Sequence, residues 1–317
     1  MPEASNNLHH CSSSNTFTRL LDMNITDNTK TFLIISVGLI AISTASIFIR
    51  MADEVPSLVI AAYRLSIAGI VLSGISLKRG LRLFDLSERR ILLLTFIAGI
   101  ALALHFAFWI ESLRHTTVAS SVVLVYTSPI WAAAIAHFFL DEKLTLKQSV
   151  GIAIALSGAA AIALSGNDDG NSSLTGNLLA IGGGMMGAVY LSVGRVLRRR
   201  KSALSYSGSV YLTAAILIIL GTFISGSALT GYTPKLYILL LLIGLIPQLI
   251  GHTAFNWALK RRSAVTVSVL MLGEPIGATL LAALFLFEIP VTGEIIGGAI
   301  LLFGIYLSSI NMKGKND

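Results

Sequence analysis

Long apolar segments alternate with short polar segments along most of the chain. The apolar segments run for roughly 20 residues, the length that an α-helix needs to cross about 30 Å of hydrocarbon. This pattern predicts an all-α membrane protein with ten transmembrane helices. The predicted spans are 31–49, 56–77, 91–112, 116–140, 146–165, 176–197, 203–225, 236–259, 264–287 and 291–311.

Composition supports a lipid environment. Hydrophobic residues make up 54% of the chain and charged residues only 12%, whereas an ordinary soluble domain has about 25% charged residues. The net charge of +7 would suit nucleic acid, but the basic residues lie in short clusters beside apolar spans, where they act as orientation signals. We therefore expect a lipid bilayer, and no nucleic acid, as a partner.

The basic residues follow one side of the predicted bundle. With the N-terminus placed inside, nineteen of the 23 Lys and Arg residues lie in inside segments, three lie outside and Arg64 lies within a span. Such an excess marks the cytoplasmic side. We expect a multi-pass protein of the cell membrane, inner or plasma, with both termini in the cytoplasm.

The two ends of the chain are predicted to lie outside the bundle. Residues 1–30 are rich in Ser, Asn and Thr and lack the apolar core of a signal peptide. We expect a disordered cytoplasmic tail there and a short one at 312–317. The single cysteine, Cys11, allows neither an internal disulfide nor a multi-cysteine metal site, and we expect no metal and no cofactor.

The two halves of the chain resemble each other. When span 4 is laid on span 9 without a gap, proline meets proline and glutamate meets glutamate at an offset of 146 residues, and glycines coincide further on. These matches in one frame indicate a duplication. The pairs include Pro129 and Pro275, Glu142 and Glu288, Gly151 and Gly297, and Gly158 and Gly304.

The duplication predicts an inverted repeat. The first repeat covers 31–165 and the second covers 174–311, with five predicted spans in each. Because five is an odd number, the second repeat must enter the bilayer from the opposite side. Inverted repeats are a common ground plan of transporters that alternate access to a central site.

Two stretches resemble the paired signature of the EamA family in the drug/metabolite transporter superfamily. They are YTSPIWAAAIAHFFLDEKLTLKQSVGIAIALSGAAAI (126–162) and LGEPIGATLLAALFLFEIPVTGEIIGGAILLFGI (272–305), and span 2, with AAYRLSIAGIVL (61–72), is similar to the family's first half. The resemblance covers about 31–311. It departs at FEIP (287–290), where a Gly-Glu pair and a polar turn are more usual.

The resemblance implies a ten-helix permease that moves a small metabolite. It also implies a central cavity lined mainly by spans 3, 4, 8 and 9, with contributions from spans 1 and 6. Because the family moves very diverse solutes, membership indicates the mechanism more closely than the substrate.

Glu274 is predicted to lie near the middle of span 9. A charged side chain at that depth is costly unless it is paired, protonated or facing water, so it is a candidate for substrate binding or proton coupling. Pro275 should kink the helix and leave the carbonyl of Met271 without its usual partner, and Pro129 predicts the matching kink in span 4. Alternatively, Glu274 bonds to the opened backbone and only stabilises the kink.

Arg64 is the basic residue within a predicted span. One interpretation is an ion pair with Glu111 near the outer end of span 3, which would make both residues structural. The other is that Arg64 faces the cavity and attracts a carboxylate, which would favour amino-acid or organic-acid substrates.

Aromatic and amide side chains complete the predicted substrate site. Small-solute sites are mostly apolar walls with a few placed polar groups, and spans 3, 4 and 8 provide that mixture. Taken singly, each is also a plausible packing or interface residue. The candidates are His105 and Trp109 in span 3, Tyr126, Ser128 and Trp131 in span 4, and His252 and Asn256 in span 8.

Other polar and small residues suit structural roles. Glu142 and Glu288 close spans 4 and 9, where capping or gate contacts are expected, and His137 and Trp257 are interface anchors. Closely spaced glycines let helices approach, either within the fold or at the face of a homodimer. The glycines concerned are Gly151, Gly158, Gly183, Gly187, Gly293, Gly297 and Gly304.

Three classes of function fit a multi-spanning protein. A secondary transporter requires no nucleotide site, and no G-x-x-x-x-G-K-[ST] loop is present. A membrane-embedded enzyme would need deep paired aspartates, a metal cluster or a Ser/His dyad, which the predicted spans do not offer. A subunit without transport of its own is the third class. The inverted repeat favours a transporter of small organic metabolites, such as amino acids, and not an enzyme.

Overall fold

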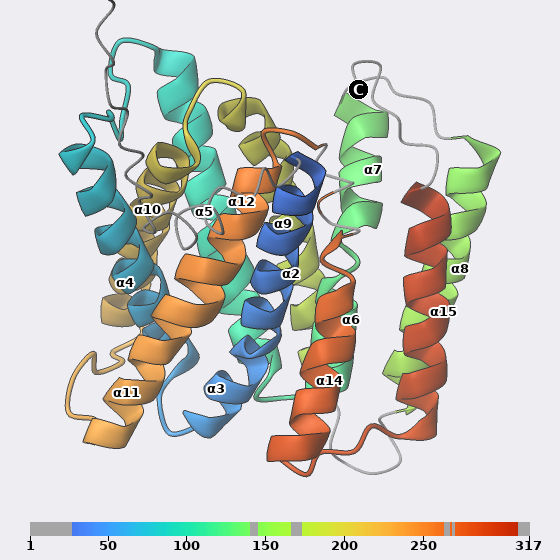
Figure 1. Ribbon diagram of the computed structural model, residues 1–317. Coiled ribbons are helices and arrows are strands. Elements are labelled where there is room, and N and C mark those ends of the chain that lie inside the picture. The colour runs from blue at the N-terminus through green and yellow to red at the C-terminus, as the bar shows by residue number, and fades with distance from the viewer. Residues whose placement is uncertain (1–26, 140–144, 166–172, 263–266, 268–269, 310–317) are drawn as a thin grey trace, which may run out of the picture.

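The computed structural model describes residues 27–139, 145–165, 173–262, 267 and 270–309. Within these ranges every regular element is a helix (Figure 1). The predicted tails fall almost entirely outside them, and so does Glu142. The helices are α2 (Asp27–Ser43), α3 (Ala45–Met51), α4 (Ser57–Lys78), α5 (Arg89–Ser112), α6 (Val118–Val125), α7 (Ser128–Phe139), α8 (Leu146–Ser165), α9 (Leu174–Arg198), α10 (Ala203–Ile224), α11 (Pro234–Ile243), the π-helix η1 (Gly244–His252), α12 (Thr253–Ala258), α14 (Gly273–Phe285) and α15 (Thr292–Ser309).

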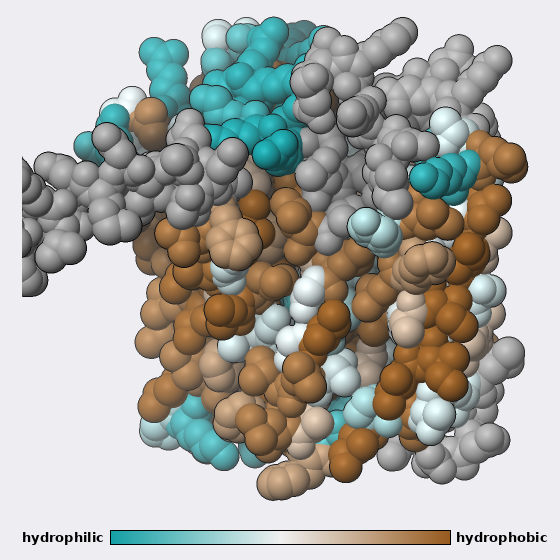
Figure 2. Space-filling model, turned by 45° about the vertical axis from the view of Figure 1, so that its right-hand side comes forward, coloured by the Kyte–Doolittle hydropathy of each residue, from teal (hydrophilic) through white to brown (hydrophobic). Residues whose placement is uncertain are grey.

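The helices match the predicted spans. Among the described residues, seven helical segments are long and apolar enough to cross a bilayer, and three shorter apolar helices correspond to spans 5, 9 and 10. Figure 2 shows exposed apolar residues as a band between two ends that carry polar residues. The protein is therefore an integral, multi-pass membrane protein. That the chain crosses the bilayer ten times stays a prediction.

Hydroxyl side chains cap the starts of α6, α9, α10 and α11. Thr117, Ser173, Ser202 and Thr233 each accept a hydrogen bond from the backbone N–H three residues further on. The first N–H groups of a helix have no partner within the helix, so such caps supply one. The polar residues between the apolar segments thus determine where these helices begin.

The two halves pack against each other in pairs that respect the repeat. The equivalent helices α4 and α10 contact each other, and so do the equivalent helices α8 and α15. The contact between α5 and α9 has its counterpart in the contact between η1 and α2. Figure 1 shows α8 and α15 side by side and running in opposite directions. The layout is that of two repeats, with these equivalent helices inverted.

Glycines bring the backbones of α8 and α15 into contact. A Cβ atom on Gly158 would lie 2.4 Å from the nitrogen of Leu301 and 2.6 Å from the carbonyl oxygen of Gly297. A Cβ atom on Gly304 would lie 2.3 Å from the nitrogen of Ala155. The sequence left open whether these glycines pack within the fold or form a dimer face. They pack within the fold and give no support to a homodimer.

We predict that Gly158→Ala lowers the thermal stability of the detergent-purified protein. The added methyl group would meet backbone atoms of α15, which can yield only if the two helices separate, and overpacking of this kind costs about 1–3 kcal/mol. Gly74→Ala is the matched control, because a Cβ atom there would meet nothing within 4 Å. Equal melting temperatures for the two variants would contradict a tight contact at Gly158.

Candidate functional site

Both halves interrupt or begin a helix at equivalent positions. In the first half α6 ends at Val125 and α7 begins at Ser128, and in the second half α14 begins at Gly273. Each position lies just before a proline, Pro129 or Pro275. The structure thus has a helix start just before each of these prolines, and the kinks themselves stay a prediction.

The backbone at these positions is bonded in another way than in a regular helix. The carbonyl of Met271 was predicted to lack its usual partner because Pro275 has no N–H, and it accepts instead a hydrogen bond of 2.9 Å from the N–H of Glu274. In the first half the N–H of Thr127 donates to the carbonyl of Leu124 over 3.1 Å. Both bonds span three residues, as in the tight last turn of a helix. The opened backbone is thus partnered without the Glu274 side chain.

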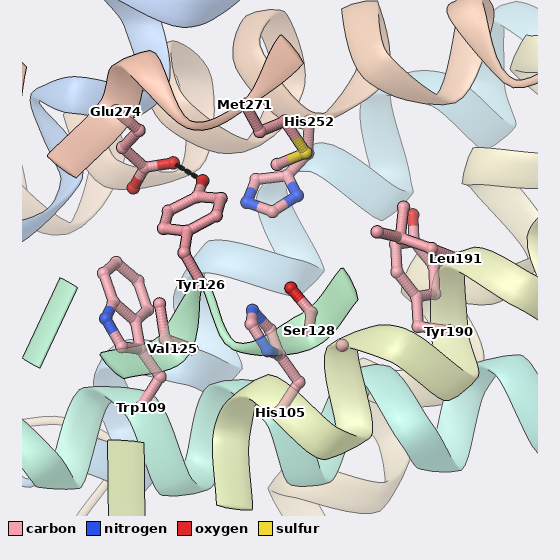
Figure 3. Close-up of a pocket in the computed structure, with 11 residues that line it drawn as sticks. His105, Trp109, Val125, Tyr126, Ser128, Tyr190, Leu191, His252, Met271 and Glu274 are labelled. Atoms are coloured by element: carbon pink, nitrogen blue, oxygen red, sulfur yellow. Dashed lines mark hydrogen bonds between the residues drawn. The ribbon is translucent and has the colours of Figure 1, made fainter. Parts of the chain in front are cut away.

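A cavity lies between the two helix starts (Figure 3). Its empty volume, opening included, is about 500 Å³. Two pairs of lining residues are equivalent in the repeat, since Val125 matches Met271 and Ser128 matches Glu274 at the offset of 146. The cavity therefore lies where the two halves meet.

The structure brings six of the nine predicted substrate-binding residues together at this cavity. His105 and Trp109 share one face of α5, as their spacing predicted, and their ring centroids lie 6.3 Å apart. The ring of His252, at the end of η1, lies 6.5 Å from that of His105. The six are His105, Trp109, Tyr126, Ser128, His252 and Glu274.

Glu274 supplies the carboxyl group of the cavity. Its side chain is only 6% exposed, and the hydroxyl of Tyr126 donates a hydrogen bond to it (Figure 3). Ser128 occupies the equivalent place in the first half, so the two halves differ chemically at this position. A buried carboxyl beside a hydroxyl and open to a cavity can bind a cation, accept a hydrogen bond or carry a proton.

Arg64 does not pair with Glu111, and that prediction is wrong. The Arg64 side chain is fully buried, and its Nε donates a 2.6 Å hydrogen bond to Oε1 of Gln248. Instead, Oε1 of Glu111 lies 3.0 Å from Nε2 of His115, which is four residues further along the chain. The depth of two residues in neighbouring spans did not reveal which faces of the helices they occupy. Arg64 is not among the residues that line the cavity.

Asn256 and Trp131 also lie away from the cavity lining. The Asn256 amide nitrogen donates to the hydroxyls of Ser207, over 2.9 Å, and Tyr211, over 3.0 Å, while its oxygen accepts from the hydroxyl of Tyr190 over 2.7 Å. Trp131 Nε1 lies 3.2 Å from the Thr127 hydroxyl, to which it donates. These contacts suit structural roles in the residues around the cavity.

Five lining residues were not predicted. The repeat could have identified Val125 and Met271, because they are equivalent and each lies three positions before the residue that precedes a proline. Gly187 was assigned to packing alone, although a Cβ atom on it would lie 3.1 Å from Nδ1 of His105. Nothing in the apolar sequence of span 6 distinguished the other two. The five are Val125, Gly187, Tyr190, Leu191 and Met271.

The π-helix η1 was not predicted either. The sequence indicated one continuous helix over 236–259, but the structure has a wider turn over Gly244–His252, with Pro247 inside it. Proline cannot donate the N–H that a regular helix requires, and π segments are frequent at functional sites. In this protein the π-helix supplies both His252, which lines the cavity, and Gln248, which binds Arg64.

Repeated helical halves that meet at a cavity have the layout of a membrane transporter. The chain belongs to the EamA-like transporter family, whose model matches residues 29–164 and again residues 174–310. The two matches coincide with the two predicted repeats. The resemblance seen in the sequence is thereby confirmed.

Curated relatives carry transporter names. A probable terminal-alkyne amino-acid exporter from Streptantibioticus cattleyicolor is 25% identical over 212 residues, which cover 63% of this chain and 67% of the relative. An uncharacterized transporter from Archaeoglobus fulgidus is 24% identical over 287 residues, covering 89% and 98%. A solved crystal structure matches with a TM-score of 0.64 at 21% identity, covering 88% of this chain and 97% of that one, which shows a common fold.

We predict that Asn256→Ala lowers thermal stability, whereas Ser128→Ala does not. The first substitution leaves the buried hydroxyls of Tyr190, Tyr211 and Ser207 without the amide that joins them, and each unsatisfied group costs about 1–3 kcal/mol. The second only removes a hydroxyl from the wall of the cavity. Melting temperatures in detergent test both. A loss of stability in Ser128→Ala as large as that in Asn256→Ala would contradict this division.

Proposed function

We propose that the protein is a secondary transporter that moves small organic metabolites, amino acids among them, across the cell membrane by alternating access. The observation that carries this proposal is the position of the cavity, which lies between equivalent residues of the two repeats. When two inverted halves rock against each other, a site at their junction can face either side in turn.

The lining of the cavity suits a small organic solute. His105, Trp109 and Tyr126 present flat ring surfaces, and Val125 and Met271 add apolar area. Ser128 and Glu274 add the few polar groups that orient a ligand in such sites. The amino-acid class is favoured by the relative from Streptantibioticus cattleyicolor, which is named a probable terminal-alkyne amino-acid exporter.

Contacts between the halves close the end of the bundle opposite to the clustered basic residues. Nη2 of Arg50, in the last turn of α3, lies 3.3 Å from Oε2 of Glu288 in the second half. The same nitrogen donates to the carbonyl of Thr116 over 2.8 Å. Glu288 also accepts a hydrogen bond from the N–H of Val118, which is the capping contact expected of it. These bonds join the start of α6 to the loop after α14.

A second carboxylate strengthens the same closure. Glu294, near the start of α15, accepts hydrogen bonds from the hydroxyls of Thr117 and Ser120 at the start of α6, the latter over 2.6 Å. For a solute to enter from this end, the start of α6 must break its hydrogen bonds to both glutamates. The positive-inside rule places the opposite, basic end in the cytoplasm, so we assign the closed end to the outer side and both termini to the inner side.

Glu274 is the group that we propose for proton coupling. It belongs to one half only, it is buried, and its partner Tyr126 comes from the other half. A carboxyl in that position can exchange its proton for a solute when the halves move. Transport driven by a proton gradient would then depend on this carboxyl.

The test is flux in liposomes that contain the purified protein. Labelled amino acids, nucleobases and cationic drugs are offered with and without a pH gradient. We expect flux of at least one class, and we expect Glu274→Gln to lose the stimulation by the gradient because glutamine cannot titrate. Loss of one hydrogen bond to a charged group corresponds to about a tenfold or larger change in an equilibrium constant.

Glu111→Gln is the matched control, since Glu111 pairs with His115 at a helix end and its side chain is 41% exposed. It should leave the response to the gradient intact. An undiminished response in Glu274→Gln would remove the proton step from this residue and point to His105 or His252. Absence of flux for every class in the panel would overturn the proposed function.

A further inference from the structure

Four buried nitrogen donors have no hydrogen-bond partner among the residues that the structure describes. They are Nη1 and Nη2 of Arg64, Nε2 of Gln248 and Nε1 of Trp109. All four are donors, so the group that would complete them must be an acceptor. Buried donors of this kind are costly when left unpartnered, and a buried positive charge adds to that cost.

The four atoms belong to one cluster built from three helices. The bond from Arg64 Nε to Gln248 Oε1, 2.6 Å long, fixes the guanidinium of α4 to the π-helix η1. The guanidinium carbon lies 4.2 Å from the ring centroid of Phe106 and 5.5 Å from that of Trp109, both on α5. Trp109 in turn lines the cavity. The cluster therefore borders the cavity at the Trp109 ring.

The acidic groups of the described residues leave Arg64 without a salt bridge. Glu274 is near enough to Arg64 for an electrostatic interaction. The hydrogen bond that Glu274 accepts, however, comes from the hydroxyl of Tyr126. Nε of Arg64 donates its hydrogen bond to Gln248, and the ring of Phe106 lies against the guanidinium. The two terminal nitrogens are the donors that stay available.

We propose that Arg64, Gln248 and Trp109 form a subsite for the carboxylate of the transported solute. The planar guanidinium presents paired donors that match the two oxygens of a carboxylate. Gln248 Nε2 and Trp109 Nε1 supply further donors beside it. This inference rests on the proposed function and restricts it, because it selects solutes with a carboxylate over amines and cationic drugs without one.

The subsite also gives the solute a direction. Arg64 is positive and lies against the Trp109 ring, while Glu274 lines the cavity itself and can accept hydrogen bonds from a cationic or neutral donor group. A solute with a carboxylate at one end and an ammonium at the other would satisfy both residues at once. The rings of Trp109, His105 and Tyr126 would contact the apolar part of that solute. An α-amino acid has this arrangement.

The test compares each proteinogenic amino acid with its carboxamide, which keeps the ammonium and the side chain but lacks the negative charge. Competition for flux and ligand-induced thermal stabilisation are measured on the full chain. We expect the amino acids that bind to exceed their carboxamides by about tenfold or more, since the amide loses a charge-assisted bond to Arg64. Equal binding of acid and amide throughout the panel would overturn the subsite.

Two variants separate binding from folding. Arg64→Met removes the charge and should abolish the preference for the acid, but it also alters a buried contact. Gln248→Glu instead places a permanent carboxylate beside Arg64, so it should occupy the guanidinium and reduce the affinity for amino acids about tenfold or more while the carboxamides are unaffected. Its melting temperature should not fall, because the new carboxylate pairs a buried charge.

Gln148→Glu is the control for the change of charge. Gln148 accepts hydrogen bonds from Thr145 at the start of α8, a position that glutamate suits equally well. An unchanged preference for acid over amide in Gln248→Glu would overturn the subsite. If nucleobases or drugs are transported but acids are not preferred, this inference fails and the proposed function stands. If nothing in either panel is transported, the proposed function itself fails.

Discussion

Hydrocarbon offers no partner for a backbone N–H or carbonyl, and the rest of this structure depends on that constraint. Regular helices satisfy their own backbone, so departures from the regular helix are tolerated only where protein or a polar cavity surrounds them. The interruption after Val125, the turn before Gly273 and the π-helix that ends at His252 all adjoin one cavity. The irregular backbone and the candidate binding site are thus two aspects of the same region.

The periodic part of the structure could be predicted from the sequence. Apolar length determined the positions of the helical segments, because bilayer thickness allows few alternatives. The offset of 146 residues predicted the two-repeat layout and the equivalence of Ser128 and Glu274. Spacing of four residues placed His105 and Trp109 on one face. Each of these inferences needs only local geometry or internal comparison.

Partners across helices could not be predicted in the same way. The depth of Arg64 is readable from its position in a span, but its contact with Gln248 depends on how α4 and η1 are rotated. Asn256 shares a polar pattern with His252, yet it faces Ser207 and Tyr211 rather than the cavity. His252 ends the π-helix and Asn256 lies in α12, so their spacing of four residues alone could not separate their roles.

The glycine contact between α8 and α15 has the symmetry of a homodimer interface within a single chain. Gly151 meets Gly304 and Gly158 meets Gly297, so each helix presents the same patch to the other. In a true homodimer one substitution would alter both sides of such an interface. After duplication and fusion the two patches vary independently, so a larger residue on one helix must be accommodated at its counterpart on the other. Within one chain the two surfaces need not be identical, so they can coevolve.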